Sequence, residues 1–408
     1  MDKNIKLYGW YFAASSFLAW MPVFFLYFSE RLSLSEVLQL EAIYYISVVV
    51  LEVPSGYFSD RIGRQKTLLY GSIFLCLAIS LYIHSVNFWW LCAGQIAFAA
   101  HMAFVSGTNT VFHFESLKCK KLEAEYGPRE AKVNKWALIS GGFGALLGGW
   151  LSGFEIIYAY WLSLIAAIAA FSITLQFQEP YQNEKTKAAS NLLSQLSGSL
   201  KYLKNKSLLW LFSLYVIMYV MVHVPYEFYQ PYLKLLEEGK LLNLSSAPVM
   251  SGVLYAIAMF IGAYAASQSI HWKNNIGLNR YLMIMFVMIM IVIGLMSWLL
   301  HPVLIVMIMF RSFGWSGVKA PLFEVITPQI DAGHRATFHS MMSLISRLGF
   351  FGLLFGLSIV TPSGESSNWI QLSFLLKICF GLGIIGGVLL LFSSRSLLKN
   401  TNFNAIND

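Results

Sequence analysis

The chain contains the stretch Gly56-Tyr57-Phe58-Ser59-Asp60-Arg61-Ile62-Gly63-Arg64-Gln65-Lys66 between two long apolar segments. Glycine reaches backbone conformations that other residues avoid, so the two glycines predict a tight turn. Asp60 is followed within six residues by Arg61, Arg64 and Lys66. Such a turn is either a short connection whose positive charges set membrane topology, or a charged latch that holds two halves of the chain in one state.

The composition is that of a membrane protein. Of the 408 residues, 57% are hydrophobic and 12% are charged, whereas soluble domains have about 25% charged residues. The net charge of +8 comes from basic residues in short segments between apolar runs, which form no continuous basic face for nucleic acid. Four cysteines indicate neither disulfides nor a Cys/His metal site, and no cleavable signal peptide is expected, because the first apolar run leads directly to another.

A spanning helix needs about 20 mostly apolar residues, and twelve such segments are predicted. They are residues 7–28, 37–58, 67–84, 88–114, 134–153, 155–177, 207–231, 248–267, 280–300, 303–326, 337–360 and 370–393. The polar stretch 178–206 divides them six and six, and its leucines recur at helical spacing from Leu192 to Leu203, which predicts an amphipathic helix at the membrane surface. We therefore expect an all-α membrane protein with a bundle over 1–177, a linker over 178–206, and a second bundle with a short tail over 207–408.

Charge asymmetry gives the orientation. With both termini in the cytoplasm, 21 of the 28 Lys and Arg residues fall in cytoplasmic segments, three fall outside, and four lie within predicted helices. The two halves also echo each other: Ser106-Gly107 precedes Phe114-Glu115, and Ser316-Gly317 precedes Phe323-Glu324. Paired repeats of this kind are typical of secondary transporters.

The opening stretch resembles the signature of the major facilitator superfamily between its second and third helices, Gly-x-Leu-Ala-Asp-Arg-x-Gly-Arg-Lys. Gly56, Asp60, Arg61, Gly63 and Arg64 match, Phe58 replaces the leucine, and Lys66 is displaced by one position. The resemblance covers the full length, and it implies two pseudo-symmetric six-helix bundles and transport by alternating access.

A second stretch, Ser140 to Gly149, resembles the fifth-helix motif of proton-exchanging exporters, Gly-x-x-x-Gly-Pro-x-x-Gly-Gly. Ala145 stands in place of the proline and Ser140 in place of the first glycine. The alternative is a small-residue face that packs closely on a neighbouring helix. The chain also departs from the family in two places: helix four offers Gln95 and His101 instead of an arginine, and residues 267–273 contain no Asp-Arg pair.

The resemblance implies partners for the latch. Asp60 is expected near the start of helix eleven, around residues 336–338, where a helix N-terminus favours negative charge. Arg64 is expected to reach Glu115, and Glu324 and Arg335 are assigned to the same gate networks.

Ionisable side chains inside spanning helices are functional candidates, because they are costly in the membrane. The candidates for substrate or proton binding are Glu52, His101, His223, Glu227, Arg311, Lys319 and Arg347. Each has a structural alternative, such as a buried hydrogen bond to a neighbouring helix. Arg311 must find an anion, either a protein carboxylate or the substrate, because a guanidinium keeps its proton.

These features predict a secondary transporter in a bacterial inner membrane that exports a small, anionic organic solute such as a metabolite, siderophore or drug in exchange for protons. The protein is expected to act as a monomer in the lipid bilayer, without a cofactor, metal or nucleic acid. Uptake of such a solute is the first alternative, and a non-transporting receptor or assembly protein on the same scaffold is the second. No motif for an enzyme active site or a phosphate-binding loop is present in the sequence.

Overall fold

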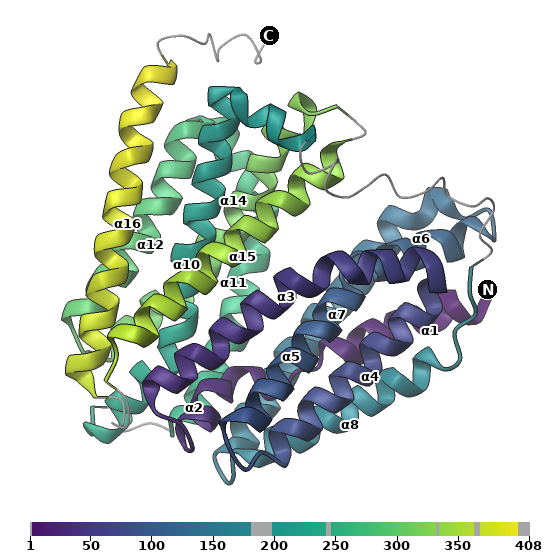
Figure 1. Ribbon diagram of the computed structural model, residues 1–408, viewed down its shortest axis with the longest axis horizontal. Helices are drawn as coiled ribbons and strands as arrows, with labels where there is room; N and C mark the ends of the chain where they lie inside the picture. The colour runs from purple at the N-terminus through teal and green to yellow at the C-terminus, as the bar shows by residue number, and fades with distance from the viewer. Residues whose placement is uncertain (1, 181–197, 242–245, 332–333, 363–367, 399–408) are drawn as a thin grey trace. The chain divides into compact units, whose positions relative to one another are not determined.

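The structure is a computed structural model, and it describes all residues except 1, 181–197, 242–245, 332–333, 363–367 and 399–408. Every regular element in these described ranges is a helix (Figure 1). In the first half they are α1 Asp2–Ser16, η1 Met21–Val23, α2 Phe24–Ser29, α3 Leu34–Ile62, α4 Arg64–Ile83, α5 Phe88–Val105, α6 Thr108–Lys118, η2 Glu123–Glu125, α7 Tyr126–Ser152 and α8 Ile157–Thr174. In the second half they are η3 Lys201–Lys204, α10 Lys206–Glu238, α11 Ala247–Ile276, α12 Leu278–Trp298, α13 Leu304–Met309, α14 Arg311–Ile326, η4 Thr327–Gln329, α15 Arg335–Val360 and α16 Trp369–Leu398.

Ten helical segments within the described ranges are long and apolar enough to cross a membrane. The two remaining predicted spans, 134–153 and 303–326, are also helical: the first lies in α7, and the second is divided into α13 and α14. Both have lower hydropathy, since the span 134–153 contains Lys135 and several glycines and α14 contains Arg311, Lys319 and Glu324. The predicted set of helices is therefore present, although the count of twelve spans is not reproduced by hydropathy alone.

Three predicted helices are interrupted. The first is divided between α1 and α2, with Pro22 at the start of η1, and proline fits the first turn of a helix because it has no N–H to donate. The fourth is divided at Gly107, whose φ of 75° lies in the left-handed region. The tenth is divided at Phe310, between α13 and α14.

By its internal contacts the chain forms two compact units. The first contains residues 1–188, 237–259 and 354–367, and the second contains residues 189–236, 260–353 and 368–408. The predicted division at the linker stays a prediction, and most of the expected amphipathic helix lies outside the described residues.

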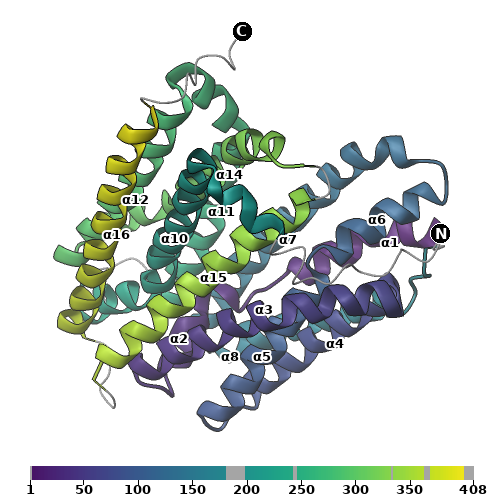
Figure 2. The same ribbon diagram turned by 45° about the horizontal axis from the view of Figure 1, so that its top comes forward.

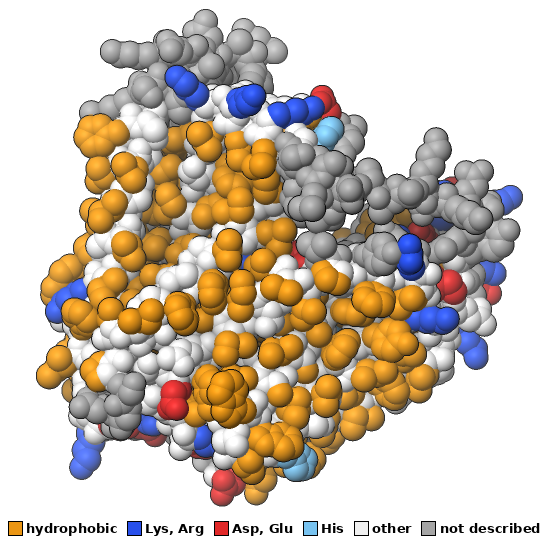
Figure 3. All heavy atoms as spheres, in the orientation of Figure 1, with side chains coloured by type: hydrophobic (Ala, Val, Ile, Leu, Met, Phe, Trp, Pro, Cys, Tyr) orange, Lys and Arg blue, Asp and Glu red, His pale blue; other side chains and the backbone are white. Residues whose placement is uncertain are grey.

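In the first unit, α4 packs against α5 and α8, while α1 packs against α7 and α8 (Figures 1 and 2). A buried apolar cluster joins α1, α4, α6 and α8 through Tyr8, Tyr11, Leu68, Phe112 and Ala170. In the second unit, α12 packs against α16 and α14. Hydrophobic side chains also cover much of the outer face seen in Figure 3, as expected for helices that contact lipid.

Close helix packing explains the glycines of α7. A Cβ atom on Gly148 would overlap the main chain of Ala19, and one on Gly149 would lie 2.7 Å from the Cα of Gly252, which belongs to the same unit. Ser140 donates a hydrogen bond of 2.8 Å to the carbonyl of Ala13. The stretch that resembles the exporter motif is therefore a surface of close contact in this chain.

Candidate functional site

The turn between α3 and α4 depends on one glycine. Helix α3 continues to Ile62, so Gly56 lies inside the helix, and the prediction that both glycines form the turn is wrong for Gly56. Gly63 alone separates the two helices, with φ of 97°. This conformation is readily available only to glycine, and the change of direction is thus confined to a single residue.

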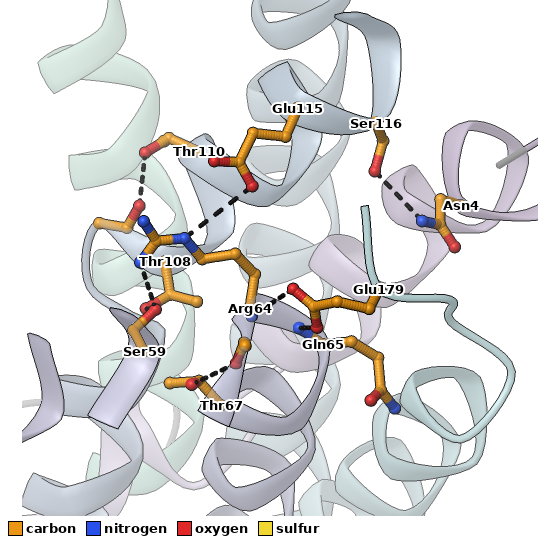
Figure 4. Close-up of polar contacts among 12 residues, drawn as sticks. Asn4, Ser59, Arg64, Gln65, Thr67, Thr108, Thr110, Glu115, Ser116 and Glu179 are labelled. Carbon is orange, nitrogen blue, oxygen red and sulfur yellow. Dashed lines mark hydrogen bonds and ion pairs between the residues drawn. The ribbon is translucent and has the colours of Figure 1, made fainter. Parts of the chain in front are cut away.

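Arg64 connects three elements on the side of this turn (Figure 4). Its Nε lies 3.9 Å from Oε2 of Glu115 on α6, and its Nη1 donates a hydrogen bond of 2.7 Å to Oγ of Ser59 on α3. Thr108, at the start of α6, donates to the same Ser59 oxygen at 3.2 Å. Arg64 and Glu115 therefore lie close together, as expected, and the Arg64 side chain contacts both α6 and α3.

Glu179 is a participant that the sequence reasoning missed. Its Oε1 accepts a hydrogen bond of 2.8 Å from the main-chain N–H of Arg64, and its Oε2 accepts one of 2.8 Å from that of Gln65. The first N–H groups of a helix lack internal partners and carry partial positive charge, so this carboxylate caps α4. Next to it, the main-chain N–H of Gln178 donates to Asn4 Oδ1 at 2.9 Å, which fixes the segment after α8 to the first helix.

The remaining predicted latch residues fall into two groups. The side chain of Asp60 lies outside the described residues, and so does that of Ala336 at its expected partner helix; their pairing stays a prediction. Arg61 is exposed. Arg335 is also exposed, and its Nε donates a hydrogen bond of 2.9 Å to the carbonyl of Ile330.

The second unit contains a counterpart of this turn. Helix α11 runs to Ile276, beyond the predicted end at 267, and Gly277 then adopts φ of 83° before α12. Lys273 Nζ lies 2.8 Å from Oε2 of Glu324. The sequence Asn274-Asn275-Ile276-Gly277 aligns with Asp60-Arg61-Ile62-Gly63. The counterpart of the first turn therefore lies a few residues after 267–273, and it has Asn-Asn in place of Asp-Arg.

A basic and aromatic cluster lies within the second unit, formed by α10, α14 and α15. The Arg311 side chain is only 9% exposed, and its guanidinium lies 4.7 Å from the ring centre of Tyr226 and 5.5 Å from that of Tyr229. In the part of the chain that the structure describes, no carboxylate forms an ion pair with Arg311. Cation–π contacts stabilise its charge without neutralising it.

Other predicted residues join this cluster. The ring of His223 stacks on Tyr219 at 4.0 Å, and its Nδ1 lies 2.7 Å from the Tyr219 carbonyl. Arg311 and Arg347 are both close enough to His223 to act on it electrostatically. Glu227 is fully buried on the same helix as His223. Lys319, by contrast, is exposed, with its Nζ 5.9 Å from the ring of Phe323.

Two predicted candidates belong to the first unit. The Nδ1 of His101 lies 2.8 Å from the carbonyl of Gly71, so this histidine bridges α5 and α4. Glu52 is half-buried in α3. Across the described ranges, no three His, Cys, Asp or Glu residues are grouped so that they could hold a metal ion.

A buried polar chain in the first unit escaped the sequence reasoning. Gln95 Nε2 donates a hydrogen bond of 2.6 Å to Glu41 Oε1, and Tyr82 OH donates one of 2.7 Å to Gln95 Oε1. The three residues come from α5, α3 and α4, and all are at most 7% exposed. Within the predicted span 37–58 only Glu52 is predicted as a candidate, although Glu41 is also an ionisable residue in the same apolar run.

The fold and these charged turns define a multi-pass membrane protein of the secondary transporter class. A family model of the Major Facilitator Superfamily matches residues 7–353, and the chain belongs to this superfamily. This membership points to a transporter of small molecules rather than an enzyme. No curated protein matches the chain.

Solved structures share the fold at low sequence identity. A mutant of the nucleoside transporter NupG superposes with a TM-score of 0.80 at 12% identity, covering 96% of this chain and 100% of that one. An auto-inhibited POT family peptide transporter gives 0.71 at 12% identity, with 96% of each chain covered. A bacterial homologue of the lysosomal transporter Spinster, in an inward-facing and unoccupied conformation, gives 0.69 at 12% identity, with 97% and 96% covered.

Proposed function

We propose that this protein exports a small organic anion across a bacterial inner membrane in exchange for protons. The observation that supports an anionic substrate is Arg311, which is buried, stacked on two tyrosines and has no ion pair with a carboxylate in the described ranges. A guanidinium stays charged at all physiological pH values and presents a planar fork of donors to carboxylates and phosphates. A carboxylate-bearing solute would supply the missing negative charge.

The surroundings of Arg311 support an organic rather than an inorganic anion. Tyr219 and Trp315 have ring centres 5.3 Å apart, and Trp315 lies 6.4 Å from His223. Together with Tyr226 they place several aromatic faces beside the positive charge. Aromatic walls with a few polar groups are typical of sites for organic ligands.

The remaining parts of the proposal follow from sequence and family. Proton coupling is proposed to run through a carboxylate within the membrane, with Glu52 as the first choice and Glu227 as the second. Export rests on the resemblance of residues 140–149 to the exporter motif, and cytoplasmic termini rest on the distribution of Lys and Arg. The protein is proposed to work as a monomer.

The test of the substrate class is a thermal-stabilisation screen of purified protein against anionic, neutral and cationic organic compounds. We expect anionic compounds to raise the unfolding temperature of the wild type and of Lys377→Gln, which removes an exposed positive charge of α16. They should not raise that of Arg311→Gln. Stabilisation of Arg311→Gln equal to that of the wild type would exclude Arg311 as a substrate contact.

Direction is tested with the compound found in that screen. Export predicts proton-driven accumulation in inverted vesicles, whereas uptake predicts it in right-side-out vesicles. Binding without movement in either preparation would favour a receptor on a transporter scaffold.

A further inference from the structure

We propose that Glu41 is a proton-binding site of the first unit, positioned by Gln95 and Tyr82. This inference rests on the proposed proton coupling and names a carboxylate for it other than Glu52 and Glu227. Glu41 lies about two helical turns into α3 from the start of that helix at Leu34. It is 7% exposed, and it is therefore largely removed from bulk water.

The hydrogen bonding of Glu41 suits a protonated carboxyl group better than an ionised one. In the described part of the chain, its carboxyl group receives one hydrogen bond, the 2.6 Å contact from Gln95 Nε2. An ionised carboxylate has several lone pairs to satisfy, and a buried one is costly unless it is paired with a cation. One neutral donor does not meet that need, whereas a proton bound to the carboxyl group removes the charge.

Tyr82 fixes the orientation of the donor. Its hydroxyl donates to Gln95 Oε1 at 2.7 Å, so the amide nitrogen of Gln95 must point toward Glu41. Tyr82 is itself held by packing, with ring centres 5.2 Å from Trp20, 5.7 Å from Phe28 and 6.0 Å from Tyr160. The proton site thus has a rigid hydrogen-bonding partner in an aromatic environment.

The titratable groups around Glu41 are tyrosines. Tyr82 on α4 and Tyr160 on α8 lie near enough to Glu41 to interact with it electrostatically. Tyr44 lies on the same helix as Glu41, α3, and interacts electrostatically with Tyr82. Helix α5 contributes Gln95, and α2 contributes Tyr27, which donates to the Tyr82 carbonyl at 2.7 Å. Arg31, which follows α2, lies over the Tyr27 ring and pairs with Glu30 at 3.4 Å. Glu41 is therefore the group in this cluster suited to exchange a proton.

The test needs no substrate. Infrared difference spectra of the purified protein in lipid nanodiscs are recorded between mildly acidic and mildly alkaline pH, in the C=O stretching region of protonated carboxylic acids. We expect a buried-carboxyl band that titrates in the wild type, is lost in Glu41→Gln and persists in Glu52→Gln. Glutamine still accepts the hydrogen bond from Gln95, so Glu41→Gln should unfold near the wild-type temperature.

Two results would overturn the proposal: a titrating band of unchanged intensity in Glu41→Gln, or no titrating buried carboxyl in the wild type. Tyr82→Phe adds a second measurement, because loss of the hydroxyl releases Gln95 and should shift the midpoint of the Glu41 band. An unshifted midpoint would refute the positioning role of Tyr82. Since no substrate enters these spectra, their failure is distinguishable from failure of the ligand screen with Arg311→Gln.

Discussion

Glu179 accepts a hydrogen bond of 2.8 Å from the main-chain N–H of Arg64, a residue 115 positions earlier in the chain. The same carboxylate also accepts the N–H of Gln65 (Figure 4). The end of α8 is thereby attached to the start of α4, directly beside the turn at Gly63. This contact gives the turn a partner inside its own unit.

Removing that cap should destabilise the protein. In Glu179→Ala the N–H groups of Arg64 and Gln65 lose their acceptor, and loss of a helix N-cap costs about 1 kcal/mol. We expect a lower unfolding temperature in detergent than for the wild type. Glu125→Ala is the matched control, because Glu125 forms an exposed i,i+4 pair with Arg129 at 2.8 Å and such pairs contribute little. Equal unfolding temperatures for the two variants would contradict the capping role.

Alanine substitutions of three glycines should distinguish the cost of backbone strain at positive φ from the cost of overlap between the new Cβ atom and its neighbours. Gly63→Ala combines a φ of 97° with a Cβ only 2.5 Å from Glu179 Oε2, whereas Gly277→Ala has a φ of 83° and no neighbour within 4 Å. A left-handed conformation costs a non-glycine residue roughly 1–2 kcal/mol. Gly56→Ala lies in a helix with no neighbour within 4 Å and should cost nothing. We expect the loss in unfolding temperature to follow the order Gly63, Gly277, Gly56; any other order would show that the turns are not held as described.

The transport rates of Asp60 and Arg64 variants test the proposed latch. Asp60→Asn is expected to lower the transport rate while membrane insertion stays intact, because a charged contact that biases one state would be lost. Arg64→Gln should act in the same direction through its contact with Glu115, which is partly exposed and thus worth at most about 1 kcal/mol. Arg129→Gln, an exposed basic residue, serves as the control for loss of charge. Wild-type rates for Asp60→Asn in vesicles would leave the turn with a role in topology only.

The ion pair of the second unit allows a charge reversal. Lys273 and Glu324 are 2.8 Å apart with side chains 14% and 48% exposed, so the pair is partly screened. Lys273→Glu and Glu324→Lys should each reduce transport, and the double variant should recover activity because the opposite charges again face each other. A double variant no better than the single ones would show that the pair does not act as a unit.

The hydrogen bond between Tyr202, at the end of the linker, and Asp331 should contribute less to stability at acidic pH. Tyr202 donates a 2.5 Å hydrogen bond to Asp331 Oδ2, and this bond, assisted by Lys201, lowers the pKa of the Asp331 carboxyl below its usual 3.8. A lowered pKa in the folded state adds stability above the usual pKa, and this stability is lost as pH falls toward the lowered one. The difference in unfolding temperature between wild type and Tyr202→Phe should therefore be present at neutral pH and shrink below about pH 4. A difference independent of pH would point to packing of the ring instead.

Much of the fold was predictable because its determinants are local. Runs of apolar residues predicted the spanning helices, and the motif from Gly56 to Arg64 indicated the family. The break at Gly107 was not predicted, although the polar stretch from Ser106 to Thr110 interrupts the apolar run there, and the break at Phe310 was not predicted either. By sequence both Gly56 and Gly63 suit a turn, and only the backbone conformation shows that Gly63 alone leaves the helical region.

The site was less predictable because it depends on contacts between distant residues. Glu179 looked like part of a solvated linker, and only its contact with the start of α4 shows otherwise. Glu41 stands in the same apolar run as Glu52, and nothing in the sequence places Gln95 beside it. Arg311 was identified as a buried cation from sequence, whereas its stacking on Tyr226 and Tyr229 required the fold.

The left-handed glycines at 63 and 277 have an evolutionary consequence. If the two halves descend from one duplicated ancestor, their side chains now differ, with Asp60-Arg61 in one half and Asn274-Asn275 in the other, while both halves have a glycine with positive φ at the turn. Selection would then act on geometry more strictly than on charge at these junctions. A saturation library across both turns should accept many residues at position 274 and very few at 63 or 277.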